Sequence, residues 1–137
     1  MAEIKRMEPL PKLARKKRVA DSGAVTPGQE RFRLQDNRRL RLSHGLFDHD
    51  AIVLHSMVKT VTLKTETGRR SVRVSYPDFR YLGFWHKPNT DAPYVCIEPW
   101  TSLPSREGII ENLALQSDLL FLDPGRQYRT AWWIEIS

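Results

Sequence analysis

Residues 56–76 read SMVKTVTLKTETGRRSVRVSY, and this stretch decides the fold. Within residues 71–76, Val72 and Val74 fall on one face and polar side chains fall on the other. This alternation is typical of a β-strand with one buried face. The preceding residues are rich in β-branched side chains, and the Gly-containing residues 65–69 supply a turn between the two halves. The stretch therefore predicts a β-hairpin.

Short apolar or alternating runs continue on both sides of this hairpin. Prolines, Asn, Asp and Gly separate them, and Pro77 and Pro99 are expected to end strands. Residues 101–115 are predicted to be irregular, with one helical turn near 111–115. Short strands with regular turn signals predict an all-β fold, an antiparallel β-sandwich. The expected strands span residues 51–54, 56–67, 71–76, 81–85, 94–98 and 128–136.

The basic charge of the chain is concentrated near its N-terminus. Residues 1–42 contain 12 Lys and Arg against 5 Asp and Glu, whereas the remaining residues contain 10 against 11. We expect residues 1–30 to be a basic, poorly ordered segment and residues 31–137 to form one domain with a real core. The basic run at 15–18 has two interpretations, a nucleic-acid contact or a solvated tail. Because no aromatic residues are interleaved for base stacking, we favour the tail and expect no nucleic-acid partner.

The sequence carries none of the usual signals for a membrane or an export pathway. No apolar run approaches the roughly 20 residues that span a bilayer. No apolar segment follows the basic start, so we expect no signal peptide. A single cysteine, Cys96, excludes an internal disulfide and predicts a cytoplasmic protein. Because Cys96 lies among strand residues, we expect it to be packed rather than reactive.

Residues 94–100 read YVCIEPW and place Glu98 in an apolar, aromatic strand. Burying a carboxylate there is costly unless another group pairs with it or uses it. Two interpretations stay open from the residues alone: a general base that faces a cleft, or an ion pair with an arginine at the strand end. Trp85 and Trp100 flank this strand, either as core or as a stacking surface for a sugar ring. Lys87 could reach a sugar hydroxyl or a phosphate, although an exposed lysine is usually only solvated.

Residues 46–51 read LFDHDA, with one acid on each side of a histidine. In an extended segment Asp48 and Asp50 share one face and His49 points to the other, so the spacing argues against a metal site. The ordinary interpretation is a turn in which Asp48 accepts hydrogen bonds from nearby backbone amides. We expect neither a metal nor a cofactor.

Five short motifs, in this order along the chain, resemble the aldose 1-epimerase (galactose mutarotase-like) family. The resemblance begins near residue 28 and continues to the C-terminus. It covers only the C-terminal portion of that family's β-supersandwich, and the N-terminal half is expected to be lacking. The motifs are LFDHDA (46–51), YPDF (76–79), YLGFW (81–85), CIEPW (96–100) and LDPG (122–125).

The resemblance implies an isomerase that interconverts the α and β anomers of a hexose or hexose derivative by acid/base ring opening. Glu98 matches the general base of the family, and Asp48 matches an aspartate that binds sugar hydroxyls. Trp85, Lys87 and Trp100 are the further candidate substrate contacts. The acid histidine of the family lies in its N-terminal half, and no histidine of this chain matches it by motif.

Three interpretations of the shortened resemblance stay open. The chain is a truncated product, or it pairs with a separate N-terminal half, or it is a shortened fold that binds a sugar without turning it over. The alternative function is therefore a non-catalytic carbohydrate-binding or assembly module. A half-sandwich exposes sheet edges and an apolar face, which favours a homo-oligomer or a complementary N-terminal half as partner.

Overall fold

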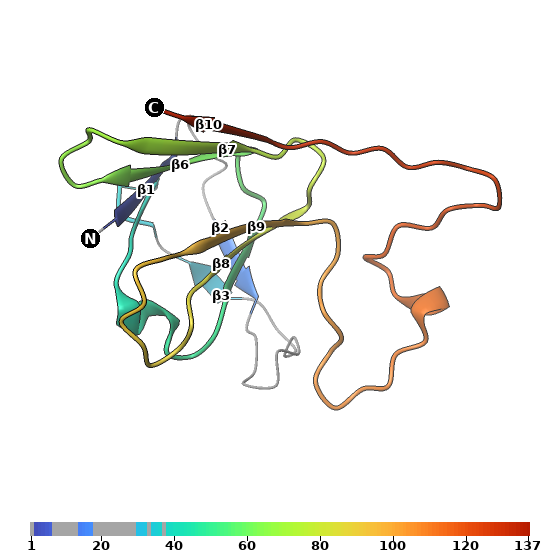
Figure 1. Cartoon of the computed structure of the whole chain (residues 1–137). Helices are drawn as coiled ribbons and strands as arrows, with labels where there is room; N and C mark the ends of the chain where they lie inside the picture. The colour runs from blue at the N-terminus through green and yellow to red at the C-terminus, as the bar shows by residue number, and fades with distance from the viewer. Residues whose placement is uncertain (1, 7–13, 18–29, 33, 37) are drawn as a thin grey trace.

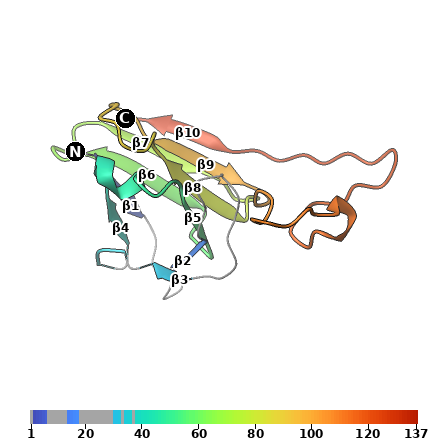
Figure 2. The same cartoon turned by 90° about the horizontal axis from the view of Figure 1, so that it is seen from below.

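The protein is a sandwich of two antiparallel β-sheets (Figures 1 and 2). This computed structural model describes residues 2–6, 14–17, 30–32, 34–36 and 38–137. One sheet has the strand order β10-β7-β6-β1-β4 and is called sheet A; the other has the order β3-β2-β5-β8-β9 and is called sheet B. The predicted all-β antiparallel fold is confirmed. The elements are β1 (Ala2–Arg6), β2 (Ala14–Lys17), β3 (Glu30–Phe32), β4 (Arg39–Arg41), the 3₁₀ helix η1 (His44–Phe47), β5 (Ile52–His55), β6 (Thr60–Thr65), β7 (Ser71–Ser75), β8 (Tyr81–Trp85), β9 (Cys96–Trp100), the 3₁₀ helix η2 (Leu113–Leu115) and β10 (Trp133–Ile136).

The predicted hairpin is formed by β6 and β7 of sheet A. Val61 lies opposite Val74 in the register, and both side chains are buried. Because side chains alternate along a strand, this pair turns the apolar face of the hairpin toward sheet B. The turn closes with the Gly68 amide donating to the Thr65 carbonyl at 2.9 Å. Gly68 has a φ of +68°, a left-handed conformation that glycine adopts without strain.

Tyr76 anchors the base of this hairpin, immediately after β7. Its ring is buried in the core, and its hydroxyl donates to the Val58 carbonyl at 2.6 Å. Its backbone amide donates to the Lys59 carbonyl at 2.9 Å. A buried tyrosine needs a partner for its hydroxyl, and these contacts supply it. The chain then turns at Pro77 and enters β8 of sheet B.

The register of the strands in sheet B shows which residues lie on each of its two faces. Phe84 lies opposite both Ile52 of β5 and Ile97 of β9, and these side chains contribute to the core between the two sheets. Gly83 lies opposite both Val53 and Glu98 on the other face, which we call the outer face. The apolar residues of β5 and β8 appear as continuous runs because both faces of these strands are covered. The main core cluster consists of Leu40, Leu42, Phe47, Ile52, Leu54, Met57, Val61, Val74, Tyr76, Leu82 and Phe84.

Several strand boundaries differ from those expected, among them those of β6, which was expected over residues 56–67 and spans Thr60–Thr65. Pro99 was expected to end its strand but lies inside β9, which continues to Trp100. Because β9 is the edge strand of sheet B, its proline is tolerated there, as prolines are on sheet edges. The last strand was expected to begin at residue 128 but begins at Trp133, where pairing with β7 starts.

Two strands lie within the N-terminal segment that was expected to be poorly ordered. β1 pairs with β4 and β6 in sheet A, and β2 pairs with β3 and β5 in sheet B. Three residues of the basic run at 15–18 fall in β2, and the fourth lies outside the described residues. The division of the chain at residue 30 stays a prediction. In the described ranges, no helix has the length and apolar character needed to cross a membrane.

Residues 101–132 form a long segment that we call the C-terminal arm. It leaves sheet B after Trp100, extends away from the sandwich and returns to sheet A at Trp133 (Figures 1 and 2). Its regular structure is limited to η2, so the predicted irregular segment with one helical turn is confirmed.

Candidate functional site

Glu98 lies on the outer face of sheet B, where Gly83 of the neighbouring strand leaves room for it. The two residues are opposite each other in the β8–β9 register. A methyl carbon placed at residue 83 would lie 3.4 Å from Glu98 Oε2 and 3.3 Å from Trp100 Cζ2. The carboxylate and the indole therefore fill the space that a side chain at residue 83 would occupy. Gly83 was not among the predicted site residues, because its importance emerges only from the register.

Aromatic side chains surround this carboxylate on the same face. Trp100 lies opposite Tyr81, and Trp85 lies opposite Cys96, each two residues from the Gly83–Glu98 pair. Both tryptophans are half-buried and pack against a second apolar cluster that includes Tyr81. Trp85 and Trp100 are therefore partly core and partly exposed. A sugar ring stacking on such a surface would contact both their apolar faces and the carboxylate between them.

The Cys96 thiol is the polar neighbour that contacts Glu98 within the strand. Burial raises the pKa of the thiol, and the negative charge of Glu98 and a hydrogen bond to its carboxylate raise it further. The thiol therefore stays protonated and unreactive near neutral pH. It is half-buried, rather than fully packed as expected. Where side chains are described, no arginine or lysine forms an ion pair with Glu98, so the ion-pair interpretation gains no support.

The contact between Cys96 and Glu98 predicts how fast the thiol is alkylated. Replacing Glu98→Gln removes the negative charge that helps to hold the thiol protonated, so the pKa of Cys96 should fall. We expect iodoacetamide to modify Cys96 several-fold faster in this variant at pH 8 to 9, measured by mass spectrometry. The control is Glu66→Gln, an exposed glutamate in the β6–β7 turn, which should leave the rate unchanged. Equal rates in the wild type and Glu98→Gln would show that the two side chains are not in contact.

Asp50 fixes the orientation of Trp85. Its Oδ1 accepts a hydrogen bond from Trp85 Nε1 at 3.0 Å and another from the Ala51 amide at 2.7 Å. Asp50 has a φ of +75°, a left-handed conformation that aspartate tolerates better than most residues. The sequence brought Asp50 to attention only as one of two acids beside His49. The structure instead makes it the partner of the indole.

Asp48 and Lys87 are the remaining predicted contacts. Lys87 lies in the loop at residues 86–95, and Asp48 follows η1 and contacts this loop. Asp48 is exposed, and its Oδ1 accepts from the Asn89 amide at 3.4 Å. Asp48 therefore accepts a hydrogen bond from a backbone amide, as predicted. The amide belongs to a loop far away in the sequence, however, and not to the turn that contains Asp48. Lys87 is exposed, and its backbone amide donates to Tyr94 Oη at 3.2 Å. Tyr94 in turn lies 6.3 Å from Trp85 between ring centroids, so this loop reaches the aromatic surface.

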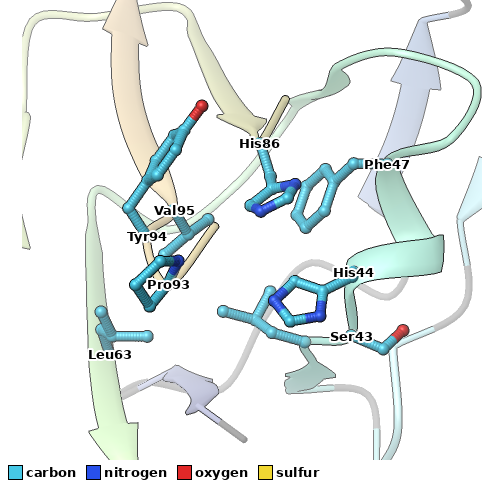
Figure 3. Close-up of a pocket in the computed structure, with 9 residues that line it drawn as sticks. Ser43, His44, Phe47, Leu63, His86, Pro93, Tyr94 and Val95 are labelled. Atoms are coloured by element: carbon cyan, nitrogen blue, oxygen red, sulfur yellow. The ribbon is translucent and has the colours of Figure 1, made fainter. Parts of the chain in front are cut away.

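A cavity of about 750 Å³ lies between η1 and the loop at residues 86–95 (Figure 3). Phe47 and Leu42 of its wall belong to the core between the sheets, so it lies on the opposite side of sheet B from Glu98. None of the five predicted site residues lines it. The lining residues are Leu42, Ser43, His44, Phe47, Leu63, His86, Pro93, Tyr94 and Val95.

Two imidazoles face each other in this cavity. The rings of His44 and His86 are 5.0 Å apart, and His86 stacks on Tyr94 at 5.1 Å (Figure 3). His86 is buried, with Nε2 lying 2.7 Å from the Ala92 carbonyl; Nε2 must carry the proton to donate there. The walls are otherwise mainly apolar, which suits a sugar with many hydroxyls poorly. Among the described side chains, no three His, Cys, Asp or Glu residues are placed to hold a metal ion.

The sequence and the structure of the chain were both compared with those of known proteins. No protein-family model matches the chain. Protein LacX, in its plasmid and chromosomal forms from Lactococcus lactis subsp. lactis, is 33% identical over 98 residues, which are 69% of this chain and 32% of LacX. The chain thus spans about a third of the length of these curated relatives.

Two solved structures superpose on nearly the whole chain. A galactose mutarotase-like protein from Lactobacillus casei matches 99% of this chain and 46% of its own length, with a TM-score of 0.89 and 22% identity. A galactose mutarotase related enzyme from Lactobacillus acidophilus matches 99% and 45%, with a TM-score of 0.82 and 22% identity. That the matched part is the C-terminal one stays a prediction. The chain resembles the galactose mutarotase-like proteins and has their fold over just under half the length of these two.

Proposed function

We propose that the outer face of sheet B binds a hexose or hexose derivative, and that Glu98 is the general base that interconverts its α and β anomers. One observation carries this proposal. The Glu98 carboxylate lies beside a half-buried tryptophan, over a glycine, on a face outside the main core. Apolar ring faces and one carboxylate suit a pyranose, whose C–H groups stack while a hydroxyl donates a proton.

The chemistry requires a balanced transfer of two protons. Glu98 takes the proton of the anomeric hydroxyl as the C1–O5 bond breaks and a C1 carbonyl forms. An acid gives a proton to O5, the C1–C2 bond rotates, and the reverse steps close the ring from the other face. Both groups must lie within hydrogen-bond reach of the sugar. Asp48 and Lys87 are proposed to hold sugar hydroxyls from the loop side.

The positions of two histidines favour a second candidate, a non-catalytic carbohydrate-binding module. His44 and His86 line the cavity whose wall includes core residues, so neither lies on the outer face that carries Glu98. The outer face does carry His55, but its ring packs against Tyr81 and its Nδ1 lies 3.1 Å from Ser56 Oγ. A chain with the base but without the acid would bind a sugar and leave its anomers unchanged. For either function we propose a cytoplasmic location, which the single cysteine supports.

Sugar titrations monitored by tryptophan fluorescence test the proposed binding site. We expect glucose or galactose to change the emission at millimolar concentrations, corresponding to about 4 kcal/mol of binding free energy. Trp100→Leu should abolish the change, because the indole forms the wall beside Glu98. Trp132→Leu, a half-exposed tryptophan of the arm, is the matched control and should keep it. An emission that no sugar alters, or that responds equally in both variants, would contradict binding at this face.

Polarimetry separates the two candidate functions. If Glu98 is the base, the wild type should speed the equilibration of α-glucose or α-galactose, and Glu98→Gln should return the rate to that of buffer. Binding without acceleration in the wild type would instead establish the non-catalytic module. Acceleration that persists in Glu98→Gln would exclude Glu98 as the base.

A further inference from the structure

We propose that the C-terminal arm and β10 form a docking surface for a polypeptide that carries the half of a galactose mutarotase-like fold not covered by this chain. This inference does not depend on sugar binding. It rests on the exposed apolar side chains of the arm, on the open edges of the two sheets, and on the extent of the structural match.

The arm presents apolar side chains to solvent along most of its length. Ile110 is fully exposed, Leu115 is 80% exposed and Phe121 is 67% exposed. Single exposed apolar residues are normal on a protein surface, but a continuous series of them marks an interaction site. The large exposed apolar residues between 101 and 136 are Ile109, Ile110, Leu113, Leu115, Leu120, Phe121, Leu122, Tyr128, Trp132, Trp133, Ile134 and Ile136.

The contacts within the arm are mainly local, and they include the buried Gln116 side chain, whose Nε2 donates to Asp118 Oδ1 at 3.1 Å. The Leu103 amide donates to Asp118 Oδ2 at 2.7 Å, which closes one local loop. Arg106 pairs with Glu111, and this contact is also local. Farther along, Thr130 Oγ1 lies 3.5 Å from Asp78 Oδ2, at the limit of a hydrogen bond. A segment of this length without a sheet or a long helix is uncommon in a compact domain unless it serves a function.

The row of apolar side chains with which β7 faces the core continues onto β10, the edge strand of sheet A. Ile134 lies opposite Val74, and Ile136 lies opposite Val72, so both isoleucines belong to the row that faces the core. Val74 is buried, yet Ile134 is 53% exposed and Ile136 is 82% exposed. β9 and β10 are also the edge strands of their sheets, among the strands described. A partner that fits here must cover an apolar face and sheet edges together, as a further β-layer would.

The extent of the structural match identifies that partner. The superposition with the L. casei protein covers 99% of this chain, so it includes the arm. The arm therefore follows the same course in a protein more than twice as long. An extended segment held by few contacts of its own takes that course when the rest of the larger fold packs against it. The part of that fold outside the matched region is therefore the occupant that matches the arm.

A second copy of this chain fits the surface less well. The arm and β10 together (residues 101–137) carry five Asp and Glu side chains against three arginines, so this surface has a net negative charge. A symmetric dimer places the same patch of each protomer against the other, which would bring two negative arms together. Like charges that meet at an interface disfavour binding.

The test uses the full 137-residue chain and the part of the L. casei protein that lies outside the matched region, produced as a separate polypeptide. Size-exclusion chromatography with light scattering should show a one-to-one complex. Hydrogen exchange, read by mass spectrometry, should show fast amide exchange in residues 101–132 of the chain alone. In the complex, exchange there should slow by about a hundredfold or more, because these amides become buried or paired.

Two double variants show whether the arm is the surface that binds. Leu120→Asp with Phe121→Asp should abolish the complex, because it places charges in the apolar contact. Gln35→Asp with Thr67→Asp adds the same charge at exposed positions outside the arm and should leave the complex intact. Absence of a complex would overturn the proposal. A dimer of the chain alone with a protected arm would also overturn it, in favour of a second copy as the occupant.

Discussion

Replacing Phe84 with alanine is expected to lower the free energy of unfolding by about 3–5 kcal/mol. Phe84 is 1% exposed and is the fourth of the five residues of β8. It faces Ile52 of β5 on one side and Ile97 of β9 on the other. Removing the ring loses its transfer free energy and leaves a cavity between the two sheets. Urea unfolding monitored by circular dichroism measures the change.

The matched control is an apolar residue whose side chain is exposed to solvent rather than buried. Ile110→Ala also removes apolar atoms, but Ile110 is fully exposed in the arm of the isolated chain. We expect its effect to stay within about 0.5 kcal/mol. A similar loss in both variants would mean that the arm is already packed against the sandwich, in conflict with the structure.

The alternation of side chains made the centre of the fold predictable. Residues 71–76 showed one apolar face in the sequence, and β7 forms with Val74 buried on that face. The hairpin turn was predictable for a related reason, because Gly68 supplies the left-handed φ that the turn requires. These features depend on neighbours in the sequence and on a period of two, so residue patterns reveal them.

The C-terminal part was less predictable because its apolar residues do not face this chain. The run at 119–122 has the composition of a buried segment, yet Leu120 and Phe121 are exposed. Alternation from residue 128 also suggested a longer strand, but pairing begins only at Trp133. Hydrophobicity shows that a residue needs a partner, but it does not show which polypeptide provides it.

The sequence predicted the carboxylate of the candidate site, Glu98, but not the residues that position the groups around it. Glu98 stood out because a carboxylate among aromatic residues requires an explanation. Gly83 and Asp50 act through contacts across strands or from a turn to a strand, which appear only once β8, β9 and the start of β5 are aligned. The residues that shape the site thus became visible through the register rather than through their own chemistry.

Gly83→Val is expected to disrupt the proposed site while leaving the sandwich folded. A side chain at this position would meet Glu98 Oε2 and Trp100 Cζ2 at 3.4 and 3.3 Å already at its first carbon, and valine adds two more. Both groups must therefore move. Valine itself suits a strand, so secondary structure measured by circular dichroism should persist. Displacing a catalytic group by about 1 Å costs about a hundredfold in rate, and we expect a loss of this size in any acceleration of anomer equilibration.

The same variant gives a readout that is independent of sugar chemistry. If valine pushes the carboxylate away from Cys96, the charge that raises the pKa of the thiol moves with it. Alkylation of Cys96 should then speed up in Gly83→Val as it does in Glu98→Gln. Thr65→Val, which introduces valine at an exposed position at the end of β6 in the other sheet, should change neither quantity. If Gly83→Val left both quantities unchanged, then Glu98 would not lie over Gly83, and the outer face would lose the geometry on which the sugar site depends.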